Sequence, residues 1–124
     1  MLKVRLDQDN HTLKLLLDGH AGQADIGHDI VCSACSILAY TLAQYVKCAE
    51  AEGGLACPPY ITLDSGYAVV ECEPREDYFD GIYGAYQFAQ LGYILLEHNY
   101  PQFVELTQFG TEDSVNINQK DSLT

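Results

Sequence analysis

The segment 29–54 reads DIVCSACSILAYTLAQYVKCAEAEGG and has the period of an amphipathic helix. Asp29 is of a residue type that often caps a helix N-terminus. Gly53-Gly54 supplies the residue that a left-handed C-cap requires. The sequence therefore predicts one long helix that begins at Asp29 and ends before Gly53. Its apolar face is formed by Val31, Ala34, Cys35, Leu38, Leu42, Tyr45, Val46 and Ala49.

The residues before this helix contain two strand-like segments and a glycine-rich segment. Residues 2–6 alternate between apolar and charged side chains, and residues 12–18 contain an apolar run. The polar residues 7–10 between them are a turn signal, so we expect a hairpin. Residues 19–28 contain three glycines and show neither a helical nor a strand period, which predicts a mobile loop.

The residues after the helix again have two strand-like segments followed by a helical one. Residues 60–63 and 67–72 are predicted strands, joined by a turn at residues 64–66. A second long helix is expected at about residues 76–97, where glycines either weaken the helix or mark close helix contacts. Residues 103–106 are expected to form a short edge strand.

This order of elements predicts an α+β fold. Strands that do not strictly alternate with helices are typical of a mostly antiparallel sheet with two long helices packed on one face. The chain has 124 residues, which is the size of one ordinary domain. We expect residues 1–109 to form a single domain and the polar residues 110–124 to form a disordered acidic tail.

The overall composition restricts the classes of partner. Six basic and eighteen acidic residues give a net charge of −12, which argues against nucleic acid and anionic membranes as partners. Neither a membrane-spanning apolar run nor a signal peptide is evident, so we expect a cytoplasmic protein. The five cysteines are therefore expected to be thiols.

Cys32 and His20 are the candidates for chemistry. A thiol attacks as its thiolate, and a helix N-terminus or a neighbouring imidazolium lowers the pKa of a cysteine from its usual value of about 8.5. Cys32 follows Asp29 by three residues, which places it in the first turn of the predicted helix, beside unpaired amide groups. His20 leaves the second predicted strand at the start of the glycine-rich segment, and its ring can reach the sulfur if that strand lies beside the start of the helix.

The sequence around these two residues resembles the signature of the ribosomal-processing cysteine protease family, Prp. The matching residues are Gly19-His20-Ala21, Gly27, Asp29-Ile30-Val31-Cys32, Ala34 and Ser36. The resemblance extends over roughly residues 1–107 and leaves the tail unexplained. This chain departs from the usual pattern in having Ser33 and Cys35, and the second change creates a Cys-x-x-Cys pair.

The resemblance implies a substrate, an assembly and a set of site residues. Proteins of this family remove a short N-terminal extension from the precursor of ribosomal protein bL27, and they are homodimers that use neither a metal nor a cofactor. His20 would be the general base and Cys32 the nucleophile. Asp29 would cap the helix or orient the site, and Ser36 would donate a supporting hydrogen bond. The loop that covers the substrate would include Gly19, Ala21, Gly22, Gly27 and His28.

Other interpretations of the same residues remain open. Cys32 and Cys35 have the spacing of a thiol redox protein, although a glycine loop and not a strand precedes them. Together with His20 and His28 they would supply four zinc ligands, but the chain has no second paired-ligand motif. His28 also competes with His20 as the base. Finally, the chain would be a non-catalytic module that binds a basic peptide or the ribosome if Cys32 were inert.

Overall fold

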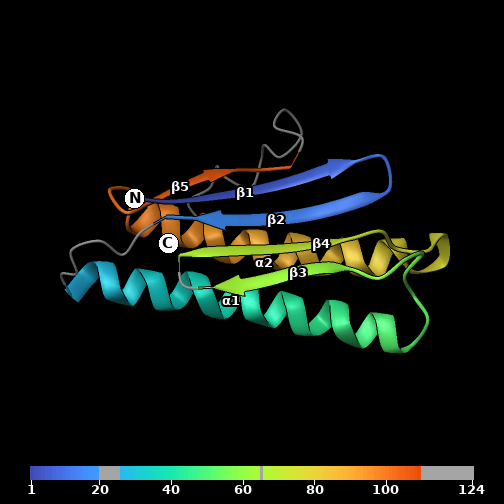
Figure 1. Ribbon diagram of the computed structural model, residues 1–124. Coiled ribbons are helices and arrows are strands. Elements are labelled where there is room, and N and C mark those ends of the chain that lie inside the picture. The colour runs from blue at the N-terminus through green and yellow to red at the C-terminus, as the bar shows by residue number, and fades with distance from the viewer. Residues whose placement is uncertain (20–25, 65, 110–124) are drawn as a thin grey trace.

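The computed structural model describes residues 1–19, 26–64 and 66–109, with the backbone alone at residues 26–29. The order of elements agrees with the predicted one (Figure 1). The elements are β1 (Leu2–Asp9), β2 (Thr12–Asp18), α1 (Ile26–Ala51), β3 (Tyr60–Asp64), β4 (Tyr67–Cys72), a 3₁₀ turn (Glu76–Tyr78), α2 (Phe79–Asn99) and β5 (Val104–Thr107).

The five strands form one sheet in the order β3-β4-β2-β1-β5. All neighbours are antiparallel except β1 and the short edge strand β5, which are parallel. The two helices lie side by side against one face of this sheet (Figure 1). The predicted α+β class, with two long helices on one face of a mostly antiparallel sheet, is confirmed.

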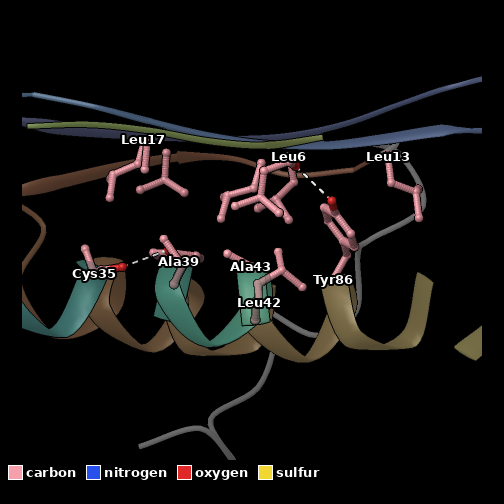
Figure 2. Packing of buried hydrophobic residues seen from close by; sticks show 14 of the residues in the cluster. Leu6, Leu13, Leu17, Cys35, Ala39, Leu42, Ala43 and Tyr86 are labelled. Atoms are coloured by element: carbon pink, nitrogen blue, oxygen red, sulfur yellow. Dashed lines mark hydrogen bonds between the residues drawn. The ribbon is translucent and has the colours of Figure 1, made fainter. Parts of the chain in front are cut away.

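The core fills the space between the sheet and the helices. Strand alternation turns one set of apolar side chains toward the helices, and Leu6, Leu15 and Val70 lie opposite one another in one such row. In Figure 2, Leu6, Leu13 and Leu17 of the sheet face Cys35, Ala39 and Ala43 of α1. Each fully buried leucine contributes about 1.5–3 kcal/mol, so this layer holds the sheet and helices together.

Two buried tyrosine hydroxyls connect α2 to the other layers. The hydroxyl of Tyr86 donates a hydrogen bond of 2.8 Å to the carbonyl oxygen of Val70 in β4. The hydroxyl of Tyr93 donates one of 2.9 Å to the carbonyl oxygen of Cys35 in α1. Because both polar atoms are satisfied, the rings can be buried without the cost of an unpaired hydroxyl.

The C-terminus of α1 matches the prediction. Gly53 has a φ of +81°, and its amide donates to the carbonyl oxygen of Glu50 at 2.9 Å. The amide of Gly54 donates to the carbonyl oxygen of Ala49 at 2.8 Å. This pair of bonds is a Schellman motif, which satisfies carbonyl groups that the end of the helix leaves open.

The N-terminus of α1 differs from the prediction. The helix begins at Ile26, so Asp29 lies in its first turn and is not its N-cap, and residues 26–28 are helix and not loop. The prediction gave too much weight to the capping preference of Asp29 and to Gly27 as a helix breaker. One glycine costs only about 1 kcal/mol in a helix, and a helix that packs along its whole length tolerates that cost.

The hairpin and the second helix also differ at their ends. Residues 7–9 continue β1, because Asp9 still pairs with Thr12 of β2 and the turn needs only the next two residues. Asn10 takes the positive φ of this turn, at +59°. The second helix opens with the 3₁₀ turn before α2 begins at Phe79. Residues 110–124 lie outside the described residues, so the tail and the domain boundary at residue 109 remain predictions.

Candidate active site

A cleft of about 320 Å³ lies where α1 passes the end of the sheet. One wall comes from α1, and the other comes from the ends of β1, β2, β3 and β4 and their connections. The lining residues are Leu2, Leu17, Gly19, Cys32, Ser33, Ser36, Tyr40, Asp64, Gly66 and Ala68. The cleft therefore brings the predicted nucleophile together with residues from both halves of the chain.

Cys32 is half-buried and lines this cleft, while Val31 beside it is fully buried. Cys32, Ser36 and Tyr40 are spaced four residues apart, so they lie along one side of the helix, and all three line the cleft. The predicted supporting residue Ser36 thus shares the cleft with the thiol. A reagent or a peptide has access to Cys32, as a nucleophile requires.

Cys32 lies deeper in the helix than we expected. It is in the second turn of α1, because the helix begins at Ile26 and not at Asp29. Only the first four amides of a helix lack a partner within the helix, and the effect of the helix dipole fades beyond the first turn. The helix terminus therefore offers a thiolate at Cys32 less stabilisation than predicted.

Two glycines fix the other wall of the cleft. The amide of Gly19, directly after β2, donates a hydrogen bond of 3.0 Å to the carbonyl oxygen of Gly66. A Cβ on Gly19 would lie 2.6 Å from the carbonyl oxygen of Met1. Gly66 has a φ of +78°, and its Cβ would lie 2.7 Å from the oxygen of Gly19. Both positions therefore need glycine, because the backbones approach too closely for a side chain.

The other predicted site residues are only partly placed. His20, Ala21 and Gly22 lie outside the described residues. The contact of His20 with Cys32 therefore stays a prediction. Gly27, His28 and Asp29 lie in the first turn of α1, where only their backbone is described. Of the predicted loop at residues 19–28, residues 26–28 are helical, and residues 20–25 lie outside the described residues.

Cys35 has the environment of a core residue. Its side chain has no exposed surface. Burial, and to a lesser extent the nearby Cys32 sulfur, raises the pKa of the Cys35 thiol from 9.0 to about 12. Cys35 is therefore a neutral thiol at physiological pH, which disfavours rapid thiol exchange. Within the described part of the chain, no three His, Cys, Asp or Glu side chains gather into a group that would hold a metal.

Sequence reasoning missed seven of the lining residues, which are Leu2, Leu17, Ser33, Tyr40, Asp64, Gly66 and Ala68. Tyr40 could have been found, because it continues the four-residue spacing from Cys32 through Ser36. The residues at positions 64 and 66 could not, because their place in the cleft depends on β4 pairing with β2 and not with β1.

Solved structures with the same fold come from two bacteria. The Staphylococcus aureus ribosomal processing protease Prp in complex with a substrate peptide has a TM-score of 0.65 and 19% sequence identity, covering 87% of this chain and 99% of that one. SMU.848 from Streptococcus mutans has a TM-score of 0.64 and 23% identity, covering 88% of this chain and 94% of that one. At such identities the likeness shows the fold alone. A search among curated proteins finds no match.

The sequence itself matches one protein family. The sequence profile described as Cysteine protease Prp matches residues 1–105, which include both halves of the sheet, both helices and the cleft. The resemblance inferred from the motif around His20 and Cys32 is thereby confirmed, and this chain belongs to the cysteine protease Prp family.

Proposed function

We propose that this chain is the peptidase that removes the N-terminal extension of the ribosomal protein bL27 precursor, with Cys32 as nucleophile and His20 as general base. The observation that carries the proposal is the position of Cys32, half-buried in a cleft with Gly19 on the opposite wall. His20 is the next residue in the chain after Gly19. The hydrogen bond between the Gly19 amide and the Gly66 carbonyl oxygen, at the wall of the cleft, supports His20 as the base.

The proposed reaction is acyl transfer. The Cys32 sulfur attacks the carbonyl carbon of the scissile peptide bond, and His20 takes the thiol proton. The tetrahedral intermediate collapses when the carbon–nitrogen bond breaks and His20 returns the proton to the leaving amine. A water molecule, deprotonated by His20, then attacks the thioester and releases the acid product and the free thiol. Ser36 and Asp29 would hold the nucleophile and the base in position.

The size of the cleft suits an extended peptide. The helix rises about 1.5 Å per residue, so the row from Cys32 to Tyr40 is about 12 Å long. An extended peptide advances about 3.3 Å per residue, so the row spans roughly three or four substrate residues. The S. aureus relatives are solved with a substrate peptide and with a covalently linked product peptide, which supports a peptide substrate here.

The same proposal includes the class of substrate, the cellular compartment and the oligomeric state. A net charge of −12 attracts a basic ribosomal peptide at long range, and this supports bL27 as the substrate class. The precursor would be met in the cytoplasm, where ribosomes assemble. The family resemblance also supports a homodimer, and no metal or cofactor enters any of the proposed steps.

A cleavage assay tests the assignment of the nucleophile. Wild-type protein, Cys32→Ala and Cys48→Ala are each incubated with bL27 precursor, and the masses of the products are measured by mass spectrometry. Cys48 is an exposed thiol on the same helix and does not line the cleft, so its variant is the matched control. Wild type and Cys48→Ala should release the extension, and Cys32→Ala should release none. Undiminished cleavage by Cys32→Ala would reject the proposal.

A further inference from the structure

The cleft that holds Cys32 has one charged residue in its described lining. Asp64 alone among the lining residues is an Asp, Glu, Lys, Arg or His. It is the last residue of β3 and is exposed, at the rim of the wall that faces α1. The row on α1 contributes only the thiol of Cys32 and the hydroxyls of Ser36 and Tyr40. A peptide bound along that row therefore meets a single carboxylate.

No basic side chain lies beside Asp64 in the described part of the sheet. The ion pair that the described residues form lies within β1 and does not involve Asp64. The direct strand partner of Asp64 is the uncharged Tyr67. Lys3 lies in the same cross-strand row, but Asp18 and Tyr67 stand between them, and three strand spacings amount to about 14 Å. This exceeds the screening length of about 8–10 Å, so the carboxylate keeps its charge for a ligand.

We propose that Asp64 selects substrates that carry a lysine or arginine side chain in the stretch of peptide bound along the cleft. This selection rests on the proposed peptidase function and adds to it. The net charge of −12 attracts any basic partner at long range, whereas one carboxylate in the cleft acts on one substrate side chain. Because the row on α1 spans roughly three or four substrate residues, the basic residue lies within about four residues of the scissile bond.

A role in the turn is the competing explanation for Asp64. Asp64 and Tyr67 flank the turn between β3 and β4, and aspartate and asparagine are both common at the first position of a turn. Asparagine would therefore preserve a turn role, but it removes the charge. Asp64→Asn separates the two explanations, and Asp64→Lys reverses the charge.

The effect of Asp64 should appear in binding. An exposed ion pair of this kind changes affinity by up to about fivefold. A group that holds a substrate side chain away from the reacting atoms binds the substrate and the transition state equally, so its loss raises KM and leaves kcat unchanged.

Cleavage of a peptide series tests the selection. Peptides of the bL27 precursor carry lysine, norleucine or glutamate in turn at each of four positions on either side of the scissile bond. At one position, wild type should prefer lysine to norleucine by about fivefold in kcat/KM, through a lower KM. Asp64→Asn should lose this preference, and Asp64→Lys should prefer glutamate. Glu105→Gln is the matched control, because Glu105 is exposed on β5 at the opposite edge of the sheet, and it should keep the preference.

Charged thiol reagents test the carboxylate without a peptide. The Cys32 thiolate attacks the sulfenyl sulfur of a methanethiosulfonate, forms a mixed disulfide and releases methanesulfinate. Rates for the cationic aminoethyl and the neutral methyl reagents are measured by peptide mass mapping, and their ratio cancels changes in thiol reactivity. The ratio at Cys32 should fall several-fold in Asp64→Asn. It should stay the same at Cys48, an exposed thiol on the same helix outside the cleft.

Three results would overturn the proposal. The first is a wild type that cleaves the peptides without preferring lysine at any position. The second is a lysine preference that survives in Asp64→Asn. The third is a wild type that cleaves no peptide and has the same reagent ratio at Cys32 as Asp64→Asn. Absence of cleavage together with a ratio that depends on Asp64 would reject the peptidase function and support the selection of cations by the cleft.

Discussion

Cys32 and Cys35 are three residues apart on α1 and have opposite surroundings. Cys32 is half-buried at a cleft, and Cys35 is sealed between the helices and the sheet. The pKa of the Cys35 thiol is raised to about 12, mainly by loss of hydration. The Cys-x-x-Cys spacing therefore arises from one cysteine that lines a cleft and another that fills the core as a small apolar residue.

Burial of Cys35 should make stability depend on alkaline pH. In the folded chain its pKa is raised from 9.0 to about 12, so the unfolded chain loses this proton first as pH rises. The neutral thiol stabilises the fold fully below about pH 9, and this contribution is lost as pH rises toward 12. The free energy of unfolding should fall over that window by up to about 1.4 kcal/mol per pH unit from this group.

Urea unfolding at pH 7, 9 and 10.5 measures the effect, with Cys35→Ala as the comparison. The variant should show a smaller loss between pH 9 and 10.5 than wild type, and it should still cleave the precursor at neutral pH. Equal pH dependence in both proteins would contradict the role of this thiol. Loss of cleavage in a folded Cys35→Ala would revive the redox and metal interpretations.

At the scale of elements, the cleft depends on how the end of the sheet is joined to α1. β2 ends at Asp18, and Gly19 then contacts Gly66 of the β3–β4 connection through a backbone hydrogen bond. This contact ties the start of the segment that carries His20 to the wall of the cleft. The local backbone, and not any side chain, sets where that segment begins.

Gly19→Ala should therefore affect both stability and catalysis. The new Cβ would lie within 3 Å of the backbone of Met1 and Leu2, so the backbone must shift. We expect a loss of about 1–3 kcal/mol in the free energy of unfolding and a large fall in kcat. Gly84→Ala is the control, because nothing lies within 4 Å of a Cβ there, and it should stabilise α2 by about 0.5–1 kcal/mol.

Thermal or urea unfolding and the cleavage assay together separate the two variants. A Gly19→Ala protein with full stability and full activity would show that the close contact with Gly66 does not position the site. A Gly84→Ala protein that is less stable than wild type would show that the packing of α2 leaves less room than described.

The sequence predicted elements better than it predicted their ends. The hairpin, both helices and the β3–β4 pair follow from apolar periodicity and turn residues, which act locally. The start of α1 was placed too late because packing along the helix outweighs local capping preference. Tyr45 was placed on the apolar face of the first helix by its spacing, yet it is 44% exposed beside a groove between α1 and α2, because a tyrosine can lie at the edge of an apolar stripe.

At the scale of the whole molecule, the fold separates two surfaces along α1. Cys32, Ser36 and Tyr40 line the cleft at the end of the sheet, whereas Ile37 and Tyr45 line the groove against α2. Among the residues of the candidate site, the sequence alone could predict mainly those that lie on α1. Cys32 was singled out by its place at the start of the helix and Ser36 by the family resemblance, but the residues of the opposite wall come together only through the strand order.

We propose that the fold brings His20 to Cys32 and so keeps the sulfur reactive at neutral pH. Cys32 lies in the second turn of α1, where the helix terminus alone gives little support to a thiolate. The most direct measurement is the rate of Cys32 alkylation by iodoacetamide against pH, followed by peptide mass mapping in wild type and His20→Ala. The wild-type rate should already be high at neutral pH, and that of His20→Ala should rise only toward pH 8.5, the usual range of a free thiol. Superimposable profiles for the two proteins would contradict the claim.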